Sequence, residues 1–163
     1  MIQRTSYALF ALWAFSGCIY TFGARLPNGY ERVFFAVPEN RTGYPLVQDV
    51  GVGYGYQILR SDGRLKITDS ASARLILRSV FTSYAKVPDK YDNSGKVITY
   101  RLNLSGSVAF VDKATGENFI PQRSFTGTTL WSPDNESEEE ALKRAMGDFY
   151  SQAIRYLFSS VEW

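Results

Sequence analysis

Residues 98–110 alternate between apolar and polar side chains. The apolar positions are Ile98, Tyr100, Leu102, Leu104, Val108 and Phe110, and the polar ones are Thr99, Arg101, Asn103, Ser105 and Ser107. Successive side chains of a strand point to opposite faces, so this pattern predicts an antiparallel β-strand with one buried and one solvated face. A sheet with one apolar face needs a second layer to cover that face.

Residues 137–160 are expected to form an amphipathic helix that supplies this layer. The run Ser137–Glu140 is a capping box, and its three carboxylates favour the positive end of a helix dipole. The apolar residues that follow fall on a single helical stripe: Leu142, Ala145, Met146, Phe149, Ala153, Tyr156 and Leu157.

A second helix is predicted over residues 46–60, where Val47, Val50, Tyr54 and Ile58 recur at helical spacing. Three glycines in this segment (Gly51, Gly53 and Gly55) make the helix weak unless packing supports it.

The remaining apolar runs predict strands at 33–37, 64–68, 75–87 and 117–130. Loops are expected at 38–43 and from Pro88 through 92–95, with a hairpin turn at Thr115-Gly116.

Together these elements predict an α+β fold in the order β-α-β-β-β-α. We expect a two-layer sandwich with two helices packed on one face of a roughly four-stranded mixed sheet. The chain has 163 residues, of which 45% are apolar, so it is long enough for one domain with a real core.

Composition argues against most enzyme classes. The chain has no histidine and one cysteine, which excludes an intrachain disulfide, a cysteine-based zinc site and any Ser-His dyad. A Ser-Lys arrangement stays open, but no lysine lies in a recognisable motif. Eighteen basic against sixteen acidic residues are too evenly balanced for nucleic-acid binding. We expect no catalytic residues, no metal and no cofactor.

The N-terminal residues have the pattern of an export signal. Arg4 precedes nine apolar residues (7–15), which are too few to cross a bilayer but suit a signal peptide. Phe15-Ser16-Gly17-Cys18 resembles the bacterial lipobox, which implies cleavage after Gly17 and acylation of Cys18. The alternative is an ordinary secretory signal. Because residue 19 is not Asp, the outer membrane, on its periplasmic side, is the expected destination.

We therefore expect three segments. Residues 1–17 are a lipoprotein signal peptide, residues 18–32 are a lipidated N-terminus and tether, and residues 33–163 are a single α+β domain. Anchoring would depend on several acyl chains at Cys18, since one chain alone binds membranes reversibly.

Positive charge gathers in the middle of the chain, where residues 60–123 hold eleven basic and six acidic side chains. Arg78 and Lys86 are two even-numbered positions of one predicted strand, so we expect both on its solvent face with Arg101 of the next strand. A face of Arg, Lys and Tyr could bind phosphorylated or carboxylated amphiphiles. The alternative is an ordinary solvated surface. The candidate ligand-binding residues are Arg78, Lys86, Lys90, Arg101 and Arg123.

Several segments, in their order along the chain, resemble the LPS-assembly lipoprotein family LptE. They include residues 20–22, 37–42, 61–66, 71–77, 82–84, 91–95 and 124–127, followed by the Glu-rich start of the last helix. The glycine-rich segment 51–55 departs from the family pattern. The resemblance implies a non-enzymatic protein that plugs the LptD β-barrel, supports its assembly and binds lipopolysaccharide (LPS). The alternative is a lipoprotein that activates a peptidoglycan synthase or another periplasmic envelope-binding module.

Overall fold

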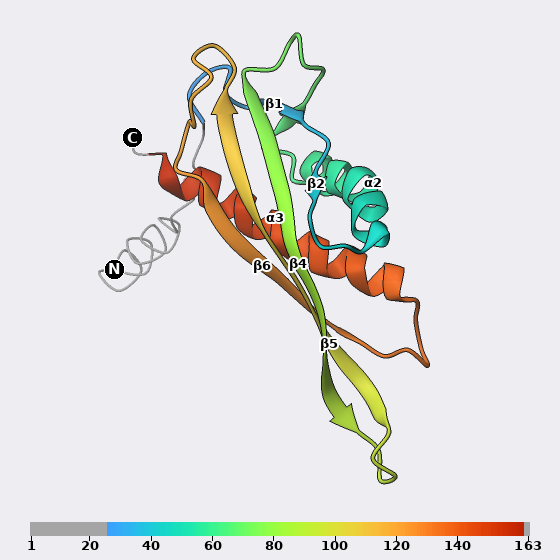
Figure 1. Ribbon diagram of the computed structural model, residues 1–163. Coiled ribbons are helices and arrows are strands. Elements are labelled where there is room, and N and C mark those ends of the chain that lie inside the picture. The colour runs from blue at the N-terminus through green and yellow to red at the C-terminus, as the bar shows by residue number, and fades with distance from the viewer. Residues whose placement is uncertain (1–25, 162–163) are drawn as a thin grey trace, which may run out of the picture.

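Two helices, α2 (Pro45–Ser61) and α3 (Glu138–Ser160), pack against an open mixed sheet in the described part of the chain (Figure 1). The computed structural model describes residues 26–161. Its strands are β1 (Arg32–Phe35), β2 (Glu39–Asn40), β3 (Lys66–Ile67), β4 (Leu75–Tyr91), β5 (Val97–Asp112) and β6 (Arg123–Trp131). The predicted α+β class with two helices on a mixed sheet is confirmed, and both helices begin and end within two residues of the expected positions.

The sheet has the order β3-β1-β4-β5-β6. Strand β1 pairs in parallel with β3 and β4, whereas β4, β5 and β6 are antiparallel. The sheet contains more strands than the four expected, partly because β2 pairs in parallel with β4 where a loop was predicted. The strand predicted at 64–68 is present as β3, although it is only two residues long.

Two strand ends differ from the prediction. Strand β4 continues past Pro88, which pairs with Tyr100 next to an irregularity in the ladder. At this position β4 pairs only with β5, and a strand with a free edge tolerates proline. Strand β6 begins at Arg123 and not at residue 117, and Asn118 makes only an isolated bridge to Val111. Pro121 lies between these two positions and limits regular pairing.

A β-bulge at Thr82 reverses the alternation along β4. The register shifts between Phe81 and Ser83, so that Phe81 lies opposite Gly106 while Ser83 lies opposite Ser105. Buried side chains therefore occupy odd positions up to Phe81, but the next buried residue is Tyr84. One extra residue in a strand moves every later side chain to the other face.

The glycines of α2 allow the helix to lie close to aromatic core residues. A Cβ at Gly51 would be 3.1 Å from the Phe81 ring, and one at Gly55 would be 2.9 Å from the rings of Phe35 and Tyr150. Gly51 and Gly55 are buried, whereas Gly53 is exposed. Packing thus compensates for the low helix propensity of this segment.

Helix α3 begins as the capping box predicts and also covers the outer edge of the sheet. The Ser137 hydroxyl accepts a hydrogen bond from the Glu140 N–H at 3.2 Å. Gln152 donates to the Thr126 carbonyl at 2.9 Å, and Asp148 accepts from the Thr128 N–H at 3.0 Å. Strand β6 is the last strand of the sheet, so these contacts protect main-chain groups that a foreign strand could otherwise bind.

Candidate functional site

The five basic residues selected from the sequence lie on two different faces of the sheet. Lys86 is opposite Leu102 and Arg123 is opposite Val108, and both of these partners are buried under the helices. Arg78 is opposite Ala109, and Lys90 is opposite Thr99, on the uncovered face that also carries Arg101. The expectation that Arg78 and Lys86 share a face is wrong, because the bulge at Thr82 separates them.

Lys86 is held at the start of α3. Its Nζ donates to both carboxylate oxygens of Glu138, at 3.1 and 3.0 Å, and lies 5.7 Å from the centre of the Trp131 ring. The Tyr84 hydroxyl donates to the same carboxylate at 2.9 Å. Burial, together with this hydrogen bond to Glu138, raises the pKa of Tyr84. The Lys86 charge is therefore already compensated within the protein.

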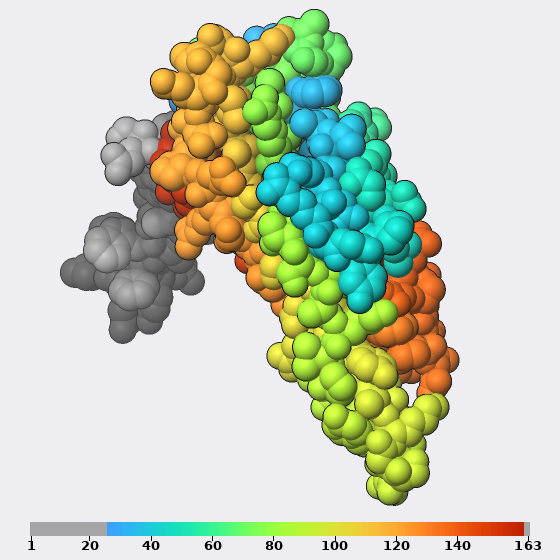
Figure 2. All heavy atoms as spheres, in the orientation of Figure 1, coloured from blue at the N-terminus to red at the C-terminus, as the bar shows by residue number. Residues whose placement is uncertain are grey.

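The uncovered face carries a mixed apolar and basic surface near the β4–β5 hairpin, which we name the distal patch. Strand pairing places Val87 and Leu130 on either side of Arg101, and their exposed fractions are 48% and 47%. The patch comprises Val87, Lys90, Tyr91, Arg101 and Leu130. The Arg101 guanidinium donates to Asp89 at 2.8 Å, which uses one of its five N–H donors. Figures 1 and 2 show that the tip of this hairpin projects beyond both helices.

Apolar side chains of this size are normally buried, and here they surround positive charge. Lys90 forms no ion pair with any residue in the range 26–161. An anionic amphiphile could place its charged group against Lys90 and Arg101 and its apolar part against Val87 and Leu130. The distal patch is therefore a candidate binding surface for such a molecule.

Closer to the centre of the sheet, the uncovered face is lined by uncharged polar side chains. Ser105 and Thr126 are hydrogen-bonded through their hydroxyl groups at 2.9 Å, and Thr128 donates to Asn103 at 3.1 Å. These contacts join β5 to β6 in a continuous polar row without formal charge. Two members of this row, Ser105 and Thr126, also line a pocket that contains Arg123.

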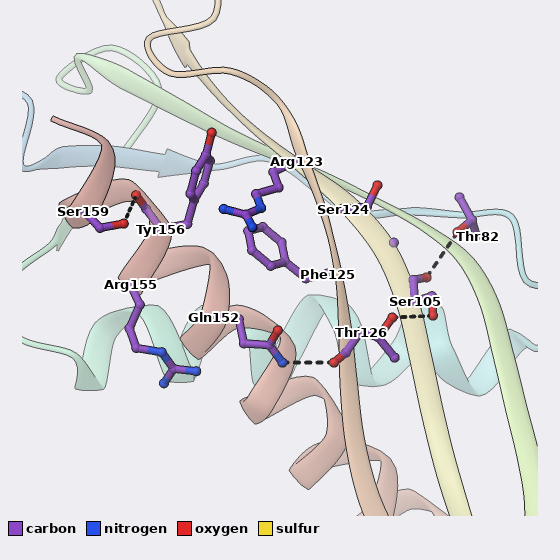
Figure 3. A pocket seen from close by; sticks show the side chains of 11 residues that line it. Thr82, Ser105, Arg123, Ser124, Phe125, Thr126, Gln152, Arg155, Tyr156 and Ser159 are labelled. Carbon is purple, nitrogen blue, oxygen red and sulfur yellow. Dashed lines mark hydrogen bonds between the residues drawn. The ribbon is translucent and has the colours of Figure 1, made fainter.

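Arg123 lies at the mouth of a pocket of about 580 Å³ between β6 and the C-terminal part of α3 (Figure 3). Its guanidinium carbon is 4.9 Å from the centre of the Tyr156 ring. The pocket is lined by Thr82, Ser105, Gly106, Arg123, Ser124, Phe125, Thr126, Gln152, Arg155, Tyr156 and Ser159. Arg123 is the one member of the predicted set in this pocket.

Sequence reasoning missed the α3 side of this pocket. Gln152, Arg155, Tyr156 and Ser159 are separated by three, one and three residues, which places them along one side of a helix. That spacing was available in the sequence as a signal. Of these four residues, only Tyr156 belongs to the predicted apolar stripe of α3, so the pocket lies beside the side of the helix that packs on the sheet.

Other kinds of site find little support within residues 26–161. No group of three or more Asp, Glu, Cys or His side chains in this range is arranged to hold a metal ion. No helix in the same range is long and apolar enough to cross a membrane. Cys18, the expected lipidation site, and the signal segment lie outside the described residues.

Comparison with solved structures shows proteins of the same fold. PelC from Paraburkholderia phytofirmans, a dodecamer, is 17% identical, with a TM-score of 0.51, and the match covers 78% of this chain and 90% of that one. A putative lipoprotein from Caulobacter crescentus CB15 is 11% identical, with a TM-score of 0.53 and coverage of 80% and 91%. Comparison with curated protein sequences finds no match.

Comparison with protein families gives a match that is consistent with the sequence motifs and with the fold. The family described as LptE, lipopolysaccharide-assembly, matches residues 31–157, which include every strand and all but the last turn of α3. The match thus covers most of the chain, including the distal patch and every pocket residue except Ser159. The chain belongs to the LptE family of lipopolysaccharide-assembly proteins.

Proposed function

We propose that this protein is a lipoprotein of the outer membrane that binds LPS and supports assembly of an LptD-like β-barrel. Acyl chains on Cys18 would anchor it on the periplasmic side. Family membership supports the LPS-assembly role. The observation that carries the binding proposal is the row Val87–Arg101–Leu130, in which two exposed aliphatic side chains flank a guanidinium.

The chemistry of the distal patch matches that of LPS. Lipid A carries phosphate groups beside acyl chains, so a binding surface needs cationic donors next to apolar area. Arg101 keeps further N–H donors beyond the one that Asp89 occupies, and guanidinium groups bind phosphate in a bidentate manner. Lys90 adds a second positive charge at the same end of the hairpin. The projecting hairpin gives a bulky amphiphile access to this surface.

A photoreactive amino acid at position 91 tests LPS binding at the distal patch in living cells. Tyr91 is 58% exposed within the distal patch, whereas Tyr56 on α2 is 44% exposed and lies on the helix layer. Illumination should link position 91 to LPS, while position 56, the matched control, should give no LPS adduct. LPS adducts at both positions, or at neither, would contradict binding at the distal patch.

The barrel partnership has a separate test. Capture of the full chain from detergent-solubilised envelopes should recover a large outer-membrane β-barrel, and depletion of the protein should lower the barrel's level and make cells sensitive to hydrophobic antibiotics. Normal barrel levels after a clean deletion would contradict the proposal. Recovery of an inner-membrane peptidoglycan synthase instead would support the alternative role as a synthase activator.

A further inference from the structure

The pocket between β6 and α3 has a lining that is rich in hydroxyl groups and positively charged. Arg123 comes from β6 and Arg155 from α3, and six of the eleven lining residues carry hydroxyl groups (Figure 3). Among the described residues, no carboxylate lines the pocket. This combination disfavours a cation and favours an anion that also presents hydroxyl groups.

Both arginines have donors available for a ligand. Neither Arg123 nor Arg155 forms an ion pair within residues 26–161, although eight other such pairs occur there. The Tyr156 ring lies 4.9 Å from the Arg123 guanidinium carbon, which supports the guanidinium while its N–H groups remain available. Such a group binds phosphate in a bidentate manner.

The walls of the pocket are fixed by hydrogen bonds between α3 and the sheet side. Gln152 donates to the Thr126 carbonyl at 2.9 Å, and the Tyr156 hydroxyl donates to the Pro121 carbonyl at 3.0 Å. Ser124 lies on the outer edge of the last strand, where no further strand of the described chain pairs with it. Its hydroxyl and main chain can therefore meet a ligand. A volume of about 580 Å³ lies within the range of small-molecule sites.

We propose that this pocket binds a phosphorylated sugar, with Arg123 holding the phosphate, the Ser/Thr hydroxyls holding the ring, and Arg155 adding positive charge at the edge of the pocket. The sugar phosphate could be a soluble molecule or the head group of a glycolipid. The second source rests on the proposed function, because it needs a membrane anchor at Cys18. The proposed site differs from the distal patch and shares no residue with it.

The position of the pocket fits a head group near the anchored end. The Tyr30 and Phe119 rings stack with their centres 4.5 Å apart. The Pro121 carbonyl accepts a hydrogen bond from the hydroxyl of Tyr156, which lines the pocket. The start of the described chain is thus linked through residues 119–121 to the pocket.

Amide NMR of the ¹⁵N-labelled full chain in detergent tests the proposal directly. N-acetylglucosamine 1-phosphate should shift the amide signals of Ser124, Gln152 and Ser159, and it should bind at least tenfold more tightly than inorganic phosphate or N-acetylglucosamine. Arg123→Ala should weaken binding by tenfold or more, and Arg155→Ala, on the exposed side of α3, should weaken it by a smaller factor. Arg78→Ala is the matched control, since Arg78 lies on the opposite side of the sheet and also has no ion pair within 26–161.

Equal binding of inorganic phosphate and the sugar phosphate would contradict the role of the hydroxyl groups, and unchanged affinity in folded Arg123→Ala would contradict the phosphate site. LPS micelles added to the same sample distinguish the two sources. Competition between LPS and the sugar phosphate indicates a glycolipid head group, whereas independent binding indicates a soluble ligand. If the pocket binds no sugar phosphate but distal-patch variants still lose LPS binding, the sugar-phosphate site is contradicted and the proposed function is not.

Discussion

The Lys86 ammonium lies 3.0 Å from Oε2 of Glu138, the first residue of α3. This contact joins the β4–β5 hairpin to the helix layer, and Tyr84 adds a second hydrogen bond to the same carboxylate. Lys86 therefore stabilises the structure instead of presenting charge to a ligand.

Replacing Lys86 with Ala should lower the free energy of unfolding by about 1 kcal/mol, because the ion pair is only partly exposed and also satisfies Glu138. LPS affinity should stay unchanged. Chemical denaturation measures the first effect and a binding titration the second. A Lys86→Ala variant of normal stability with weaker LPS binding would show that Lys86 belongs to the ligand site.

The glycines of α2 should respond in opposite directions to the same substitution. A Cβ at Gly53 would meet nothing within 4 Å among the described residues, so Gly53→Ala should raise the free energy of unfolding by about 0.5–1 kcal/mol. A Cβ at Gly55 would press on Phe35 and Tyr150 at 2.9 Å, so Gly55→Ala should lower it by about 1–3 kcal/mol. Urea denaturation measures the free energy of unfolding of both variants, and stabilisation by Gly55→Ala would contradict the observed packing.

Asp112 should make stability depend on pH. Its carboxylate accepts from the Tyr30 hydroxyl at 2.7 Å and from the Ala114 N–H at 2.8 Å, and these bonds, with Arg74, lower the pKa of Asp112. A lowered pKa in the folded state stabilises the protein above the usual Asp value near 3.8, and this stabilisation disappears as the pH falls through the folded value.

Asp112→Asn should therefore lower the melting temperature most at neutral pH, and the difference from wild type should shrink as the pH falls below the usual Asp value near 3.8. Thermal melts across this range measure it. Asp49→Asn, on the exposed side of α2, controls for a general loss of negative charge. A difference between wild type and Asp112→Asn that grows as the pH falls would have the wrong sign for a carboxylate stabilised in its ionised form.

Much of the fold was predictable because its two helices and long strands have strong periodic patterns. The alternation over 98–110 places Leu102, Leu104, Val108 and Phe110 in the core, and all four are buried. The capping box locates the start of α3 to within one residue. These features depend on local side-chain order, which the sequence displays directly.

The division of the basic residues between the two faces depends on non-local structure. A bulge at Thr82 leaves no mark in the composition of β4, and Tyr84 and Lys86 are both plausible on a solvated face. Only the pairing of Ser83 with Ser105 shows that the alternation has reversed. The pocket likewise forms from β6 and α3, which are brought together by tertiary packing.

Anchoring depends on Cys18, the one cysteine in the chain, which directly follows the signal segment. Cys18→Ala should leave the precursor without acyl chains and largely absent from the outer membrane. Mass spectrometry of the wild-type N-terminal fragment should show a mass increased by the acyl chains. A mature protein with an unmodified Cys18 thiol would refute lipidation.

The central claim is that the distal patch binds LPS through Lys90 and Arg101. Its most direct test is a titration of the full chain in detergent with purified LPS, comparing wild type with the double variant Lys90→Ala/Arg101→Ala. The control is Arg60→Ala/Lys66→Ala, which removes two exposed basic residues outside the patch. The patch variant should bind at least tenfold more weakly, about 1.4 kcal/mol, while the control binds like wild type. Equal affinity in wild type and a folded patch variant would contradict the claim.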